Sequence, residues 1–579
     1  MKIVRRKSPK DFGRKVKVRH DERGEAAVII AVMAVMLLAA IPLATYAATT
    51  NQLPLTRGNQ DLQSALGAAQ SGVADYINRL NQTALNQAGN YWKYSATNLP
   101  PDGNQAFTSW VKVPGSSDEY FHYSVDTSTT ASTGIVTLTS TGLQLHGSAS
   151  QYRTLKVQLR TNGFLDYLLM TDTMMIDPTL APNFTSFSSP SAAASDCAYK
   201  FSSPNDNASG ATELDTDQYQ QDRYTTGPEW NECYSLINFY VGGQTFNGPI
   251  MTNDMYYFSG DPIFNARVYS GSATQATNPN DSTHPYWIDP LNDYFGYSET
   301  TSPKFSHSGD PTYQAPLALP STNAALKSAA QVGGCTYYGP TSITFSGTTM
   351  TVYSPETTSS STNAGCVGTG ALPLPPNGVI YVSQMPSTMS CASNTNITVG
   401  GNSYSCRSSE IAVQGTITGQ VTVGSDDNVV ISGNLEYTNC ASSSSSDVLG
   451  LIAQNFVQVS SKFGSLNTTS DTCYGHAKNN PVIMAAILTL SHSFMVQNFW
   501  STGGKLGTIY LVGSLAGKYA DIEGEFSGSS IVEGYATTYT YDSRLAYLTP
   551  PFFLSPVNSA WTTTLSAEIP NPTSLPTIP

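Results

Sequence analysis

The pattern of apolar and polar positions begins with one long apolar segment near the start of the chain. From Ala26 to Ala44 no residue is charged and almost none is polar. About 20 apolar residues in a helix span the hydrocarbon core of a bilayer, and a single span must pair all its own backbone amides. We therefore predict a transmembrane helix over residues 25–48, with Pro42 near its far end, where a kink is tolerated.

A second helical pattern follows a short polar passage. Apolar residues recur at spacings of three and four and form a single stripe, which comprises Leu62, Leu66, Ala69, Val73, Ile77 and Leu80. Charged and amide side chains lie off this stripe, as in an amphipathic helix. The stripe is expected to pack either on its own domain or on neighbouring copies of the chain in a filament.

Strand patterns come next. Three segments are rich in β-branched and aromatic residues and alternate with period two: Glu119–Val125, Gly134–Leu145 and Tyr152–Arg160. A helix followed by about three antiparallel strands indicates an α+β unit over residues 49–178. Residues 179–377 are rich in Ser, Thr and Pro and are expected to form a β region with surface insertions.

Short apolar runs recur about every 15–25 residues from Gly378 onward, with turn residues between them. This is the coil spacing of a parallel β-helix, whose rungs stack and bury their inward side chains. A β-sandwich would give similar runs and stays open as the alternative. We assign residues 378–562 to a β-solenoid and 563–579 to a tail. Tyr541–Leu554 and Trp561 are expected to plug the open end of the solenoid, because solenoids need such caps.

Charge orients the apolar segment. Residues 1–24 carry ten Lys and Arg against three acids, and the remaining chain carries 18 against 38. A basic flank stays in the cytoplasm, so we expect a single-pass plasma-membrane protein with a cytoplasmic leader, residues 1–24, and an extracellular bulk. The outer part has a net charge near −20, which argues against a nucleic-acid partner.

The leader has three possible fates. It stays as an uncleaved anchor, or a signal peptidase cuts at the small-residue pattern that ends at Ala47. In the third case a prepilin-like peptidase cuts between Gly24 and Glu25 and leaves the apolar helix on the mature protein.

All eight cysteines lie in the outer part, and an even number in an exported chain indicates disulfides. Pairing of sequence neighbours is the simplest arrangement: Cys197–Cys233, Cys335–Cys366, Cys391–Cys406 and Cys440–Cys473. No Cys-x-x-Cys motif or nearby His pair indicates zinc, and the sequence predicts neither a metal site nor a cofactor.

Two stretches resemble a known family. Arg23-Gly24 before the apolar run, together with residues 68–81 and Asn90-Tyr91-Trp92, resembles the N-terminal domain of PilX-type minor pilins of actinobacteria. Residues 247–268 and 378–562 are similar to large exported actinobacterial proteins that share this domain. The resemblance implies a type IV pilus or a related assembly, and a long helix with a membrane-embedded half. Glu25 and Ile29 depart from the family pattern, in which an aromatic residue and a Glu are usual.

Catalytic motifs are absent from the sequence. There is no His-Glu-x-x-His helix, Walker A loop or Gly-x-Ser-x-Gly elbow. Asp521, Glu523 and Glu525 alternate along one possible strand and would share a face. A solvated acidic face is the simplest interpretation, and calcium or glycan contact is the alternative. Asp426-Asp427 is a second acidic pair in a turn, and His492 is expected to be a core histidine bonded to backbone.

The sequence as a whole predicts a non-enzymatic, membrane-anchored structural protein of the cell surface, with a role in pilus assembly, adhesion or display. Its expected partners are other pilin-like subunits and the assembly machinery, membrane lipid through residues 25–48, and extracellular glycan or protein. The alternative function is a surface-tethered, polysaccharide-degrading β-helix enzyme. That alternative requires three or more carboxylates to converge in one groove.

Overall fold

The structure is a computed structural model of the 579-residue chain. It describes residues 57–82, 91–128, 130, 134–147, 149–161, 163–183, 187–197, 236–271, 287–289, 294–296, 301–391, 396–527, 530–557 and 560–579. The predicted leader, the predicted transmembrane helix 25–48 and the processing residues Gly24 and Glu25 lie outside this description. Within the described part, no helix is both long enough and apolar enough to cross a bilayer. The described fold is mainly β, as predicted.

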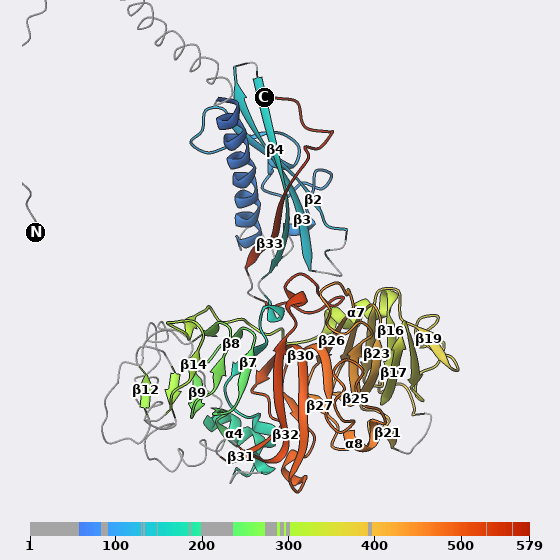
Figure 1. The fold of residues 1–579 in the computed structure, drawn as a ribbon. Helices are drawn as coiled ribbons and strands as arrows, with labels where there is room; N and C mark the ends of the chain where they lie inside the picture. The colour runs from blue at the N-terminus through green and yellow to red at the C-terminus, as the bar shows by residue number, and fades with distance from the viewer. Residues whose placement is uncertain are drawn as a thin grey trace, which may run out of the picture.

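Two units make up the molecule, and the smaller one combines a helix with an antiparallel sheet (Figure 1). We call it the helix–sheet unit. Its helix covers residues 57–81. Its sheet has the order β1-β2-β3-β4-β33, with the bounds β1 (Val111–Lys112), β2 (Glu119–Asp126), β3 (Ile135–His146), β4 (Ala149–Thr161) and β33 (Trp561–Ile569). The three strands predicted from period-two alternation are confirmed within about three residues at each end as β2, β3 and β4.

The helix packs on the sheet through its smallest residues. Gly142 on β3 lies against the helix backbone, because an added Cβ there would collide with the carbonyl of Ala65 and the amide of Ala69. The fully buried helix face comprises Ala65, Ala68, Ala69, Gly72, Tyr76 and Leu80. The predicted stripe is therefore offset from the packing face. Of its members only Ala69 and Leu80 are buried, and the other four are half-buried along one flank.

The C-terminal part of the chain returns to this unit. β33 pairs antiparallel with β4, with Trp561 opposite Thr161 and Ile569 opposite Thr154. The predicted boundary at 562 thus falls inside a strand, and residues 563–569 are not a tail. The physical reason is that β33 supplies the backbone hydrogen bonds that the edge of β4 would otherwise leave open.

The larger unit, which we call the parallel stack, is one 22-stranded sheet built mostly of parallel ladders. Its strands are β5 (Leu169–Thr173), β7 (Thr245–Asn247), β8 (Ile250–Thr252), β10 (Ile263–Phe264), β11 (Val268–Ser270), β14 (Lys304–Phe305), β15 (Thr312–Tyr313), β16 (Cys335–Tyr338), β17 (Thr341–Gly347), β18 (Thr349–Tyr353), β19 (Ala371–Pro373), β20 (Val379–Ser383), β23 (Ile411–Ile417), β24 (Gln420–Ser425), β25 (Val429–Tyr437), β26 (Val448–Ala453), β27 (Val457–Val459), β28 (Val482–Thr489), β29 (Phe494–Val496), β30 (Lys505–Tyr519), β31 (Gly524–Ser527) and β32 (Ser530–Tyr541).

The remaining elements are short. Two small sheets contain β6 (Tyr240–Val241), β9 (Tyr256–Ser259), β12 (Trp287–Asp289) and β13 (Tyr294–Gly296), and β21 (Ile397–Val399) and β22 (Asn402–Tyr404). The short α-helices are α4 (Pro190–Cys197), α7 (Ala324–Gly333) and α8 (Phe463–Leu466). The 3-10 turns are η1 (Tyr91–Lys93), η2 (Gln105–Phe107), η3 (Phe164–Asp166), η4 (Pro178–Asn183), η7 (Phe499–Ser501) and η8 (Ser543–Ala546).

Columns of similar side chains, aligned from one strand to the next, hold the stack together. One aliphatic column follows the register through Ile343, Val413, Ile431, Val459 and Val496, all buried. Each such side chain contributes about 1.5–3 kcal/mol by leaving water. β-Branched residues suit these positions because they pack against their neighbours on a pleated surface. The recurring apolar runs of the sequence are therefore the inward rungs of these ladders.

The stack does not follow sequence order. β5 enters in the middle, where it pairs with β30 on one side and β8 on the other. From β7 and β8 the sheet continues outward through β10, β11, β14 and β15, and β16 begins at the opposite end. The later strands then return until β32 pairs with β7. The stack therefore draws on all three predicted regions, 49–178, 179–377 and 378–562, because its closure depends on ladders between segments more than 250 residues apart.

The connection between the two ends runs along the outside of the stack. The backbone of Leu317 exchanges two 2.7 Å hydrogen bonds with the side chain of Asn253. Farther along, Asn323 donates to the carbonyl of Ser425 at 2.7 Å, and Lys327 on α7 pairs with Asp426 at 2.7 Å. This segment covers outward-facing apolar side chains that water would otherwise reach.

The predicted cap does not plug an end. Residues 542–557 lie across the side of the parallel stack, where the hydroxyl of Thr422 donates to the carbonyl of Pro551. Phe553 and Pro550 occupy the space left by Gly450, each 2.9 Å from the position of an added Cβ. Arg544 anchors the segment by donating to the carbonyls of Ser445 and Asp447 at 3.1 Å. The expectation of an end cap was wrong because Phe552, Phe553 and Leu554 pack against apolar side chains along the side of the stack.

Three of the predicted disulfides are confirmed: Cys335–Cys366, Cys391–Cys406 and Cys440–Cys473. Cys197 is also disulfide-bonded, and its predicted partner, Cys233, lies outside the described residues. Every confirmed bridge links segments of the parallel stack or its loops.

Candidate functional site

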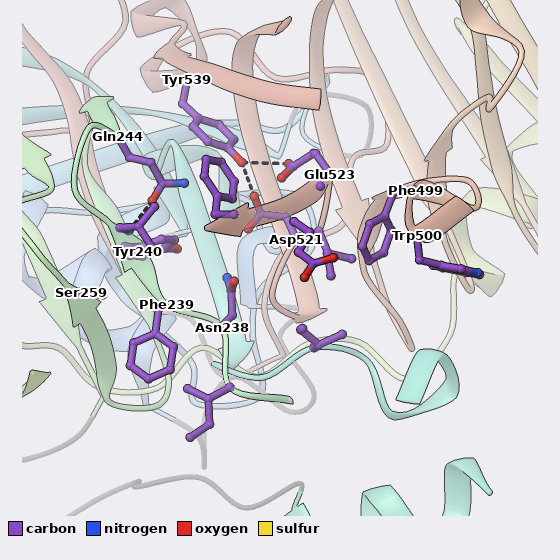
Figure 2. A pocket seen from close by; sticks show the side chains of 17 residues that line it. Asn238, Phe239, Tyr240, Gln244, Ser259, Phe499, Trp500, Asp521, Glu523 and Tyr539 are labelled. Atoms are coloured by element: carbon purple, nitrogen blue, oxygen red, sulfur yellow. Dashed lines mark hydrogen bonds between the residues drawn. The ribbon is translucent and has the colours of Figure 1, made fainter. Parts of the chain in front are cut away.

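A pocket of about 570 Å³ opens beside the β31–β32 hairpin of the stack (Figure 2). It is lined by Ile176, Ile237, Asn238, Phe239, Tyr240, Val241, Gln244, Ser259, Phe499, Trp500, Asp521, Ile522, Glu523, Gly524, Glu525, Phe526 and Tyr539. Pockets of this volume, mainly apolar with a few convergent polar groups, are the usual form of small-ligand sites.

Two acidic side chains meet at one tyrosine in this pocket. The hydroxyl of Tyr539 lies 2.8 Å from Oε1 of Glu523 and also contacts Oδ2 of Asp521 (Figure 2). The Tyr539 ring cannot move freely, because it stacks on Phe246 at 5.6 Å between centroids. Phe246 continues into a column with Phe264 and Phe305, at 5.0 and 5.3 Å. The aromatic column of the stack thus ends in the hydroxyl that organises the two carboxyl groups.

The local fold brings the acidic residues to the pocket. After β30 the chain leaves the ladder, and Ile522 forms a single parallel bridge to Met495. β31 then turns back against β32 in a hairpin. Gly524 is required at the start of this hairpin, because an added Cβ would collide with the carbonyl of Glu533. Residues 521–525 are thereby held along one wall of the pocket.

The surroundings of the acids make them chemically unequal. Asp521 and Glu523 are each 9% exposed, whereas Glu525 is exposed to solvent. Burial, and then the neighbouring charge of Asp521, raise the pKa of Glu523 well above its ordinary value. Burial, followed by the charges of the same two acids, also raises the pKa of Tyr539. The pocket therefore holds a buried carboxyl group that favours its protonated form beside an acid in contact with water.

The burial of Asp521 and Glu523 corrects the interpretation of this acidic run as a solvated face. The prediction that Asp521, Glu523 and Glu525 share one face agrees with their common place in the pocket wall. The interpretation as a solvated face holds for Glu525 alone. It was wrong for the other two, because β32 and β6 close over them. Among the described residues, no group of three or more His, Cys, Asp or Glu side chains is arranged to hold a metal ion.

The other acidic pair lies elsewhere. Asp426 accepts hydrogen bonds from Lys327 at 2.7 Å, Tyr381 at 2.6 Å and Ser383 at 2.8 Å. Although burial opposes the shift, these hydrogen bonds lower the pKa of Asp426. Asp427 accepts from Asn455 at 2.7 Å. Both acids therefore fasten loops of the stack and are not gathered into the pocket.

His492 has a different partner from the one expected. Its Nδ1 lies 2.7 Å from Oδ2 of the fully buried Asp177, and its ring stacks on Phe456 at 4.4 Å. The prediction of a backbone partner was wrong, because η4 places Asp177 beside the turn that carries His492.

Several pocket residues carry no signal in the sequence. Tyr240 and Gln244 precede Tyr539 by 299 and 295 positions in the chain, and no motif links them to it. The alternation of acids at 521, 523 and 525 was the one local signal that pointed here. No family model matches this chain, and neither a curated protein nor a solved structure matches it.

Proposed function

We propose that this protein is a pilin-like structural protein of the cell surface, anchored in the plasma membrane through residues 25–48 and displaying a β-solenoid outside the cell. In this proposal the helix–sheet unit is the pilin-like module, and the parallel stack is the solenoid. The antiparallel strands beside one long helix and the parallel ladders support the two assignments.

The direction of the helix 57–81 carries the proposal. Near its last turn, Asn81 exchanges hydrogen bonds of 3.1 and 2.7 Å with the backbone of Trp561, where the chain passes between the two units. Near its first turn, Asp61 lies 3.9 Å from His146, at the β3–β4 hairpin on the distal side. The helix therefore begins at the end farther from the stack (Figure 1). An apolar segment that precedes it would anchor one end and leave the stack projecting from the other.

The half-buried flank of the helix suits packing against other subunits. Leu62, Leu66, Val73 and Ile77 lie beside the buried face and stay half-exposed, although the last three also contact the core of the unit. Among the described residues no cysteine is free, so a single introduced cysteine would be a specific reporter. We expect Val73→Cys to form disulfide-linked dimers in membranes under oxidation. Asn78→Cys, on the exposed side of the helix, is the control and is expected to stay monomeric.

The anchor itself is tested by mass spectrometry of the mature N-terminus in fractionated cells. A start at Glu25 supports prepilin-like processing, Met1 supports an uncleaved anchor, and Ala48 supports a conventional signal peptide. Surface labelling of intact cells is expected to reach the stack in the first two cases. Recovery of the intact chain from the cytosol with reduced cysteines would contradict the proposal.

A second function is favoured by one observation. Three carboxyl groups line a single pocket of the stack, which is the condition that the sequence set for a polysaccharide-degrading enzyme. The second proposal is therefore that the displayed domain cleaves an extracellular glycan. It is tested by incubating the purified full-length protein with oligosaccharides and measuring new reducing ends.

A further inference from the structure

The pocket distinguishes its three acids by environment, and this difference is typical of acid–base pairs. Two titratable groups in unequal surroundings take separate protonation states and separate roles. Glu523 is 9% exposed and shares the Tyr539 hydroxyl with Asp521, whereas Glu525 faces solvent. Each of the three lines the same cavity.

The contacts of Tyr539 require a proton on one of the buried acids. A phenol hydroxyl has a single hydrogen to donate, yet it lies against oxygens of both Asp521 and Glu523. Two buried carboxylates this close would repel one another, so one of them is neutral. Burial of Glu523, and then the neighbouring charge of Asp521, raise the pKa of Glu523 and favour it as the acid that keeps this proton.

Glu525 is the acid of this pocket that meets solvent. It lies on β31, two residues after Glu523, and lines the same pocket. A general base in glycoside hydrolysis must have room for a water molecule beside it, and an exposed carboxyl group meets that condition. Asp521 is too close to Glu523 to act as that base, because the two contact the same hydroxyl.

The lining restricts the ligand class. None of the 17 described residues that line the pocket is a Lys, Arg or His. An acidic wall without basic side chains repels uronic-acid polymers and other anions. Amide and hydroxyl side chains from Asn238, Gln244 and Ser259, beside aromatic rings, suit the hydroxyl groups and the apolar faces of sugars. A neutral sugar or a cationic amino sugar fits this chemistry.

We propose that this pocket hydrolyses glycosidic bonds of neutral or amino-sugar glycans, with Glu523 as the general acid and Glu525 as the general base. The Glu523 carboxyl group gives its proton to the glycosidic oxygen as the bond from that oxygen to the anomeric carbon breaks. A water oxygen forms the new bond to the anomeric carbon, and the proton it releases goes to Glu525. Glu525 then releases its proton to solvent, and solvent returns a proton to Glu523. Asp521 and Tyr539 are positioning residues. The Tyr539 hydroxyl holds both buried acids in place, and the charge of Asp521 favours the protonated form of Glu523. This inference rests on the second proposed function.

The test uses the full-length protein with chito-oligosaccharides, cello-oligosaccharides and oligogalacturonate as probes. We expect hydrolysis of a neutral or amino-sugar probe and none of the uronate. Glu523→Gln and Glu525→Gln should each lower the turnover by about 100-fold or more, the usual contribution of a general acid or base. Oligosaccharide binding, measured by calorimetry, should remain. Glu119→Gln on β2 of the helix–sheet unit is the control and should keep full activity.

Two further variants separate positioning from folding. Tyr539→Phe keeps the ring that stacks on Phe246 and removes only the hydroxyl. Asp521→Asn removes the charge that holds the proton on Glu523. We expect Asp521→Asn to move the basic limb of the pH–rate profile to lower pH, because the pKa of Glu523 falls when its anionic neighbour is lost. Tyr539→Phe should move this limb to higher pH, because the hydrogen bond from Tyr539 lowers the pKa of Glu523.

The outcomes distinguish the two proposals. Hydrolysis by the wild type that persists in Glu523→Gln would overturn the assigned roles and leave the enzyme function standing. Binding without hydrolysis of any probe would overturn the enzyme function and, with it, the roles. Cleavage of oligogalacturonate alone would overturn the ligand class.

Discussion

The helix–sheet unit and the parallel stack are built on opposite principles of contact. In the unit, β2, β3 and β4 follow one another in sequence and pair antiparallel through short connections. In the stack, neighbours such as β5 and β30 lie about 340 residues apart in the chain. Local alternation is therefore sufficient to reveal β2, β3 and β4 of the first unit, whereas the stack requires pairing between remote segments. We therefore expect the stability of the stack to depend on links between remote segments that the helix–sheet unit lacks.

These links are a buried ion pair and disulfide bridges. Arg544 is 1% exposed and Asp542 is 4% exposed. In this segment, which lies across the side of the stack, Nη2 of Arg544 is 2.6 Å from Oδ2 of Asp542. The corresponding link of the unit, between Arg153 on β4 and Glu568 on β33, is partly exposed, with 29% and 40% of the side chains accessible. The unit contains no cysteine within residues 57–161 or 561–569.

The largest effect is expected from Arg544→Met. The substitution leaves Asp542 buried without its partner, and breaking a buried pair in this way costs about 3–5 kcal/mol. Chemical denaturation with hydrogen exchange should show lost protection in the stack. Arg153→Met is the matched control and should cost at most about 1 kcal/mol, because its pair is in contact with water. Equal losses in the two variants would remove this contrast between the regions.

Loss of a disulfide should come next. The double variant Cys440→Ser, Cys473→Ser removes the disulfide that links two residues 33 positions apart in the chain. Its loss should lower the free energy of unfolding of the stack by about 2–4 kcal/mol. Reductant added to the wild type should weaken the stack in the same sense. Hydrogen exchange in β2, β3 and β4 is the internal control. If reductant weakened these strands equally, the two units would unfold as one.

A smaller loss is expected from Gly142→Val, and it should be confined to the helix–sheet unit. The new side chain meets the helix backbone at Ala65, which cannot rotate away, so the helix must shift at a cost of about 1–3 kcal/mol. Gly67→Ala is the control, since no atom lies within 4 Å of its added Cβ. It should be neutral or stabilising by up to about 1 kcal/mol. A similar loss in both glycine variants would show that helix packing is not the cause.

The smallest change concerns pH. Because the pKa of Glu523 is raised in the folded state, the unfolded chain loses this proton first as pH rises. Stability should therefore fall from about pH 4.5 upward, by at most about 1.4 kcal/mol per pH unit. Glu523→Gln removes that contribution, so its melting temperature should fall less between pH 5 and 7 than that of the wild type. Parallel curves for the two proteins would show that Glu523 is ionised in the fold.

The sequence by itself determined the elements whose partners are close along the chain. Period-two alternation placed β2, β3 and β4, and short cysteine separations gave three disulfide pairs, because local contacts leave local patterns. It also located the acids at 521, 523 and 525, since alternate residues of an extended chain share a side.

The tertiary structure alone decided which of these acids are buried and what they contact. Tyr539 on β32 and Tyr240 on β6 are far apart in the chain, and no pattern in the sequence predicts that they lie over Asp521 and Glu523. The same holds for β33, which leaves the predicted tail to complete the sheet, and for β5, which joins the middle of the stack. These arrangements arise from ladders between remote segments, where hydrogen bonding and burial, and not spacing in the chain, select the partner.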